Sequence, residues 1–247
     1  MDKKIFYDWL VVQAQKQQPS ERSFQHKRLG VVKEGREARW SNPPPTHYKE
    51  SEDDTRRAKE AAHENPEIAL KAASHLDANQ RTLEIAAKHP NSAVAHAALD
   101  NPNAGIGVTE VGAQHLDKTV AMKAVTHTKS RMTTVNFASN HPDGDVALEA
   151  VTNDLTTPEA LYYGVRHSDP RVAHASLKSR RVDEHTVLHG VFNPDGDVAL
   201  RAITHRLMST MKPSEARHIA TKALKHRDPR VIREAQKFLQ QNPETNT

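Results

Sequence analysis

The sequence predicts an all-α fold, an α-solenoid of about six 26-residue repeats with two helices in each. A small hydrophobic signature recurs every 26 residues, six times without a gap, and a fixed period of this length is typical of stacked repeats. Aromatic residues make up only 4% of the chain and much of the apolar content is alanine, which suits thin layers of helices. Alternating strand patterns are absent from the sequence. The lead residues of the six copies are Ile68, Val94, Val120, Val146, Val172 and Val198.

The first helix of each repeat begins at a turn and carries the signature. With the lead residue as position 0, small or apolar residues at positions 0, 1, 4 and 5 form one wide helix face. Proline in the preceding turn costs no hydrogen bond in the first turn of a helix. These turns are Asn65-Pro66, His89-Pro90, His141-Pro142, Asp169-Pro170, Asn193-Pro194 and Asp228-Pro229.

The second helix of each repeat uses positions 15, 18 and 19, for example Leu83, Ala86 and Ala87. Position 18 is always small, which lets the backbones of neighbouring helices approach closely. Its residues are Ala86, Gly112, Ala138, Gly164 and Gly190. A seventh copy of the signature starts at Val231, displaced by seven extra residues.

Three zones follow along the chain: an N-terminal arm at 1–50, the solenoid at 51–240 and a polar tail at 241–247. The prolines of 43–45 fix an extended spacer at the end of the arm. A helix is expected to open near Ser51–Asp54 and to run to about His63, because serine and acidic residues suit a helix N-terminus. The arm holds ten Lys and Arg against six Asp and Glu, whereas residues 51–247 balance at 25 against 25. The net charge of +4 therefore lies in the arm.

The composition excludes several classes of protein. The chain has no cysteine, so disulfides and thiolate-held metal sites are excluded. It has no run of eighteen apolar residues, which predicts no membrane span. We expect a cytoplasmic protein without a cofactor.

The repeat resembles the variant leucine-rich repeat, an α-solenoid family related in architecture to HEAT repeats. The similarity rests on segments at 65–69, 141–148 and 193–200, and it covers roughly residues 52–240. It implies that each unit pairs an α-helix with a second, shorter helix and that the units stack into a right-handed superhelix. This sequence departs from the family by having alanine and valine where leucine is usual. Members share an architecture rather than one activity, so the resemblance implies no chemistry.

Histidines and acidic turns are the obvious candidates for metal chemistry, and we interpret both as structural. Position 21 holds histidine or asparagine, and position 7 holds histidine, asparagine or serine. All three side chains bond backbone groups at helix ends, and equivalent positions in stacked helices lie about 8–10 Å apart, too far to share one ion. Asp143-Gly144-Asp145 and Asp195-Gly196-Asp197 lack the further ligands of a calcium loop and fit helix starts. We predict no metal site.

The arm is the main candidate binding site, because aromatic and basic residues alternate there. Either these residues contact a partner, or the aromatics dock the arm onto the first repeat as a cap. The candidate residues are Trp9, Phe24, Lys27, Arg28, Arg36, Arg39 and Trp40.

The seven-residue insertion after His205 is the second candidate site. Leu207, Met208 and Met211 could form an adaptable apolar contact for a partner. The alternative is a lengthened helix whose apolar residues pack on its neighbour.

These observations favour a non-enzymatic scaffold or adaptor that engages another macromolecule, most readily a protein. The alternative is a nucleic-acid-binding protein that uses residues 1–50 and one basic edge of the solenoid. A HEAT-like DNA glycosylase is disfavoured, because the repeats contain no tryptophan and no net positive charge.

Overall fold

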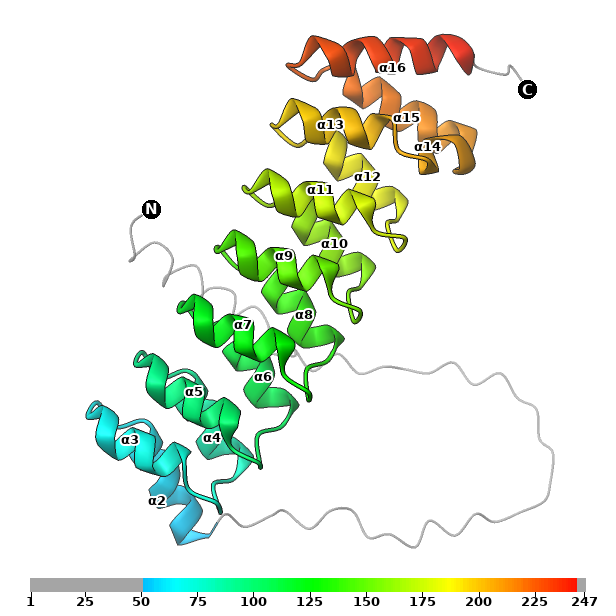
Figure 1. Cartoon of the computed structure of the whole chain (residues 1–247). Coiled ribbons are helices and arrows are strands. Elements are labelled where there is room, and N and C mark those ends of the chain that lie inside the picture. The colour runs from blue at the N-terminus through cyan, green and yellow to red at the C-terminus, as the bar shows by residue number, and fades with distance from the viewer. Residues whose placement is uncertain (1–50, 244–247) are drawn as a thin grey trace, which may run out of the picture. The chain divides into compact units, whose positions relative to one another are not determined.

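The computed structural model describes residues 51–243, and every regular element within them is a helix. Figure 1 shows these helices in order along one stack. They are α2 (Glu52–Ala61), α3 (Pro66–Ala73), α4 (Gln80–Ala87), α5 (Ser92–Asp100), α6 (Ile106–Gly112), α7 (Lys118–Thr126), α8 (Met132–Ser139), α9 (Gly144–Thr152), α10 (Pro158–Val165), α11 (Pro170–Lys178), α12 (Glu184–Val191), α13 (Gly196–Ile203), α14 (Leu207–Thr210), α15 (Pro213–Ala223) and α16 (Pro229–Gln241).

The helices lie in two layers, each built from equivalent helices of successive repeats (Figure 1). The first helices form one layer, and the second helices form the other. α2 is a half-unit before the first repeat, and α16 caps the opposite end of the stack. The α-solenoid expected from the 26-residue period is therefore confirmed. The first layer contains α3, α5, α7, α9, α11, α13 and α16, and the second contains α2, α4, α6, α8, α10, α12 and α15.

Each first helix begins at an asparagine or aspartate cap three residues before the lead residue. The side-chain oxygen of the cap accepts a hydrogen bond from the backbone N–H two residues on, which satisfies one of the free donors of the first turn. The caps are Asn65, Asn91, Asp117, Asp143, Asp169, Asp195 and Asp228. The two Asp-Gly-Asp turns are thus helix starts, as expected. Ser51 caps α2 differently, through a capping box in which its hydroxyl accepts from the N–H of Asp54 three residues on and the Asp54 carboxylate accepts from the N–H of Ser51.

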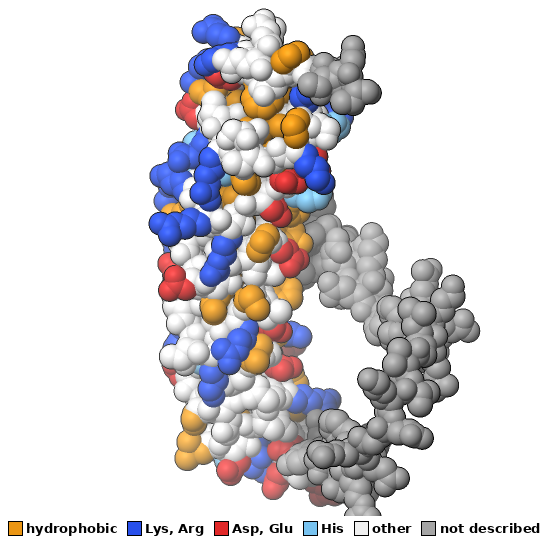
Figure 2. All heavy atoms as spheres, turned by 90° about the vertical axis from the view of Figure 1, so that its right-hand side faces the viewer, with side chains coloured by type: hydrophobic (Ala, Val, Ile, Leu, Met, Phe, Trp, Pro, Cys, Tyr) orange, Lys and Arg blue, Asp and Glu red, His pale blue; other side chains and the backbone are white. Residues whose placement is uncertain are grey.

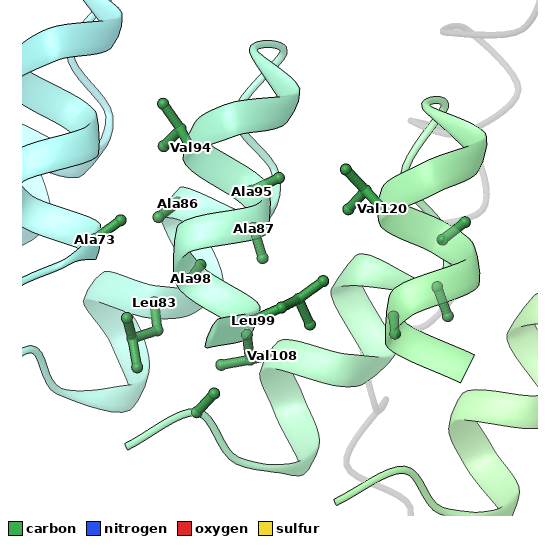
Figure 3. Close-up of a cluster of buried hydrophobic side chains, with 14 of the residues drawn as sticks. Ala73, Leu83, Ala86, Ala87, Val94, Ala95, Ala98, Leu99, Val108 and Val120 are labelled. Atoms are coloured by element: carbon green, nitrogen blue, oxygen red, sulfur yellow. The ribbon is translucent and has the colours of Figure 1, made fainter. Parts of the chain in front are cut away.

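The core lies between the two layers and consists of alanine, valine and leucine. Val94, Ala95, Ala98 and Leu99 of α5 are all buried between the neighbouring helices (Figure 3). Val94 and Val120 lie on the side of their helices that faces the preceding repeat (Figure 3). The first lead residue, Ile68, departs from the expected burial and is 37% exposed. Within residues 51–243 no first helix precedes α3 to cover it.

The small residues at position 18 allow close helix packing, as expected. A Cβ placed on Gly190 would lie 2.8 Å from the Cβ of Ala202, and one placed on Gly112 would lie 3.0 Å from the Cβ of Ala124. Both neighbours belong to the first helix of the next repeat. Any larger side chain at these positions would push the two layers apart.

The insertion contains the four-residue helix α14, and the second helix that follows, α15, has 11 residues where α12 has 8. Met208 and Met211 are buried in the core, with 5% and 8% of their surfaces exposed. Leu207 is half-buried and packs against the same core. The insertion therefore packs on its neighbours rather than projecting from the stack.

Candidate binding surfaces

The histidine column at position 21 joins each repeat to the one before it. The Nδ1 atom of His141 accepts a hydrogen bond from the backbone N–H of Asp143 (3.0 Å), and its Nε2 donates to the carbonyl of His115 (2.9 Å), the equivalent residue of the preceding repeat. Carbonyls only accept and backbone N–H groups only donate, so these contacts fix a neutral imidazole with its proton on Nε2. His89, His115, His167 and His226 make the same pair of contacts.

Where asparagine replaces histidine in this column, its side chain forms the same two kinds of hydrogen bond. Asn193 accepts from the N–H of Asp195 (2.9 Å) and donates to the carbonyl of Val165 (2.8 Å). In the column at position 7, His127 and Asn101 likewise reach carbonyls of the preceding repeat. These bonds confirm a structural role, and they cross between repeats as well as bonding the local backbone. Among residues 51–243 no group of three or more potential ligands is arranged to hold a metal ion.

A row of apolar side chains runs along the second-helix layer and remains accessible. It consists of Ile85, Val111, Phe137 and Tyr163, which occupy position 17 of α4, α6, α8 and α10. Phe137 is 42% exposed, and the other three are half-buried. Successive second helices pack side by side, so neighbours in this apolar row lie about 8–10 Å apart. None of the predictions from the sequence included this row, although an apolar residue recurs at position 17 in four successive repeats.

An aromatic cluster ends the apolar row on α10 and α12. The ring of Tyr162 lies edge-on to His189 (centroids 4.8 Å apart) and to Tyr163 (5.5 Å), and the Arg166 guanidinium lies 5.2 Å from its centroid. Arg166 also donates a hydrogen bond to the Tyr162 hydroxyl (2.8 Å). Burial, followed by the charge of Arg166, lowers the pKa of His189, which favours its neutral imidazole. Phe192, 51% exposed, follows directly after α12.

The edge formed by the starts of the first helices is charged but internally compensated. Asp145 pairs with Lys118 and with Arg171 (3.0 Å), and Asp197 pairs with Arg230 (2.8 Å). The hydrogen bond from Lys118 is the main reason that the pKa of Asp145 is lowered. These pairs are exposed and add little stability. Lys118, Arg171 and Arg230 also pair with the caps Asp143, Asp169 and Asp228, so each of these cations is already neutralised by carboxylates and offers little attraction to a further anion.

The candidate residues of the arm, Trp9, Phe24, Lys27, Arg28, Arg36, Arg39 and Trp40, lie outside the described residues. For the insertion, the structure favours the packing alternative. Met208 and Met211 line the floor of a hollow of about 410 Å³, together with Phe238 of α16. Leu207 does not line it. The role of the two methionines in binding stays a prediction.

No protein-family model, curated protein or solved structure matches this chain. No helix within residues 51–243 is both long enough and apolar enough to cross a membrane. The solenoid therefore rests on the 26-residue period and on the arrangement of the helices.

Proposed function

We propose that this protein is a non-enzymatic scaffold that binds another protein through its solenoid surface and its N-terminal arm. The apolar row is the observation that carries this proposal. A single exposed apolar side chain is ordinary on a protein surface, but a row that continues over four repeats is typical of an interaction site. Tyrosine, as at Tyr163, is among the side chains that most often dominate binding energy in interfaces, and phenylalanine, as at Phe137, is enriched in them.

The use of the histidines supports binding rather than catalysis. Histidine is the commonest general acid or base in enzymes. In the column at position 21, both ring nitrogens already bond to backbone groups, so these histidines hold the repeats in register.

Residues 1–50 are proposed as a second contact region for the same partner. They contain both tryptophans of the chain and its whole net positive charge. Tryptophan and arginine are the side chains most enriched among energetically dominant interface residues. The alternative, nucleic-acid binding, draws support from the same charge, and it predicts a steep loss of affinity with salt.

The variant leucine-rich repeat family, related to HEAT repeats, remains our proposal for the origin of the fold. It is supported by the 26-residue unit and by the pairing of two short helices in each repeat.

The experiment that tests the function begins with the full chain as bait in extract of its native cell. Captured proteins are identified, and the affinity of the leading candidate is then measured with purified components. Phe137→Ser combined with Tyr163→Ser should weaken binding by about tenfold or more, since desolvated aromatic anchors contribute about 2 kcal/mol or more.

A matched control is Leu116→Ser, which removes an apolar side chain that is 59% exposed in the α6–α7 loop and does not belong to the apolar row. This variant should bind the partner with unchanged affinity. A protein that begins at Ser51 measures the contribution of the arm. If the double variant keeps full affinity, the apolar row is not the binding surface, and if only nucleic acid is captured, the alternative function replaces the proposal.

A further inference from the structure

Basic side chains gather on the edge of the solenoid where the first helices end. Figure 2 looks onto this edge and shows lysine and arginine concentrated in its upper half. Lys178, Arg180 and Arg181, at the end of α11 and in the α11–α12 loop, are all exposed. Across residues 51–247 acidic and basic residues balance, so this concentration is local.

These three cations border a hollow of about 350 Å³ between the α9–α10 and α11–α12 loops. Val151 and Ala175 supply its apolar lining. The one acidic side chain that lines the hollow is Asp154, so the charged groups around it sum to an excess of two positive charges. The size suits a compact group rather than a track for a polymer.

Arg181 is held in place by the loop of the preceding repeat. Its Nη1 atom donates to the carbonyl of Asp154 (2.8 Å) and to that of Thr156. A guanidinium carries five N–H donors, and these contacts use one of its nitrogens. A side chain fixed in this way loses little conformational freedom when it binds a ligand.

The same loop contact is made elsewhere without an arginine. Lys129 occupies the equivalent position two repeats earlier and donates to the carbonyls of Pro102 (2.8 Å) and Ala104 (2.6 Å). Asn103, one repeat earlier again, donates to the carbonyl of Leu76 (2.6 Å). An amide or an ammonium is therefore sufficient to join the loops, and the remaining donors of Arg181 exceed what the fold requires.

We propose that this hollow, the loop-edge hollow, binds a phosphoryl group carried by a side chain of the protein partner. The proposal rests on the proposed function, since the phosphoryl group belongs to the protein that the scaffold engages. A phosphorylated serine or threonine carries close to two negative charges at neutral pH, and arginine forks pair with phosphate oxygens in two parallel hydrogen bonds. A nucleic-acid strand would need a continuous groove lined by cations, whereas this hollow is compact and lies between two loops.

The test uses the full chain and a fluorescent peptide in which one phosphoserine is flanked by glycine and alanine, at about 150 mM salt. Matched peptides carry serine or glutamate, and a single-stranded oligonucleotide serves as a further probe. The phosphopeptide should bind, and Arg180→Gln should raise its Kd by about tenfold. Arg181→Lys should raise it by a smaller factor, because lysine keeps the loop contact and the charge but not the fork.

The matched control is Arg131→Gln, which removes an exposed cation from the α7–α8 loop. It should leave the Kd of the phosphopeptide unchanged, and all three variants should melt at the temperature of the parent protein. Equal binding of the serine or glutamate peptide, or equal loss of affinity in Arg131→Gln, would overturn the proposal. Tighter binding of the oligonucleotide than of the phosphopeptide would also overturn it.

The phosphopeptide carries no large apolar side chain, so changes in the apolar row should not affect its binding. Phe137→Ser with Tyr163→Ser should therefore leave its Kd unchanged while weakening capture of the partner protein. Failure of the phosphopeptide to bind would remove the phosphoryl site and leave the scaffold proposal standing.

Discussion

Replacement of His141 by alanine tests the role of the histidine column most directly. His141 is 4% exposed, and its two ring nitrogens bond to the N–H of Asp143 and the carbonyl of His115. Alanine leaves both backbone groups without these partners. An unpaired buried polar group costs about 1–3 kcal/mol, and the partial access of water to the turn places the total near the lower end for each group. We expect the free energy of unfolding to fall by about 2–3 kcal/mol.

Asparagine at the same position should restore most of that loss. Asn193 shows that an amide accepts from the N–H two residues on and donates to a carbonyl of the preceding repeat. We therefore expect His141→Asn to cost less than about 1 kcal/mol. His96→Ala is the control, because the imidazole of His96 forms its hydrogen bond with an exposed hydroxyl, that of Thr119, and not with buried backbone groups.

The assay is urea unfolding at neutral pH, followed by the helical circular dichroism signal. Midpoints and slopes are compared separately, because an array of repeats can unfold in more than one step. If alanine and asparagine at position 141 lower the midpoint equally, the hydrogen bonds do not stabilise the stack. If His96→Ala lowers it as much as His141→Ala, the effect is a general one of histidine removal.

Three further predictions concern the core and the pH dependence of stability. Val146→Asp places an unpaired charge on a fully buried side chain and should unfold the middle of the stack, whereas Glu149→Lys, three residues on, should leave the melting temperature nearly unchanged. Thr156→Val should raise the free energy of unfolding by about 1 kcal/mol, because the buried Thr156 hydroxyl has no hydrogen-bond partner among the described residues. Valine already occupies the equivalent position of the next repeat, at Val182. A lower free energy of unfolding, measured in urea, would contradict this. Burial lowers the pKa of His205, so its contribution to stability is complete above its ordinary value of 6.5 and is lost as the pH falls below it. His205→Asn should therefore lose less stability than the parent protein between pH values just above and just below 6.5, and an identical loss would contradict the assignment.

The sequence predicts the architecture well because each feature of the repeat has a local physical cause. The caps and prolines determine where the first helices begin. Asp143 and Asp195 accept hydrogen bonds from backbone N–H groups of the first turn, as a short acidic side chain before a helix generally does. The glycines at position 18 lie where two helices approach each other closely, as Gly190 does beside Ala202 of the next repeat. These signals act within a few residues or between adjacent helices.

The sequence alone does not determine contacts that depend on how one repeat lies on another. The residue types at position 21 indicate backbone bonding, but the carbonyl that His141 reaches depends on the stacking of two turns. Ile68 carries the same signature as its equivalents and is exposed because α3 is the first helix of its layer within residues 51–243. Met208 and Met211 are equally suited to a surface or a core, and the packing of α14 decides between them.

The sequence separation of the residues that the histidine contacts join also affects how the chain folds. Most of the bonds in the column join residues 26 apart, so each repeat closes a loop of the same modest length onto its neighbour. Contacts of such limited sequence separation favour rapid folding that nucleates at any adjacent pair and propagates outward. The contact from His226 to the carbonyl of Asn193 spans 33 residues with the same geometry, since the extra residues are accommodated at the opposite edge. One edge of the molecule thus maintains the register while the other accommodates insertions, and new loops could be inserted there without interrupting the propagation of folding.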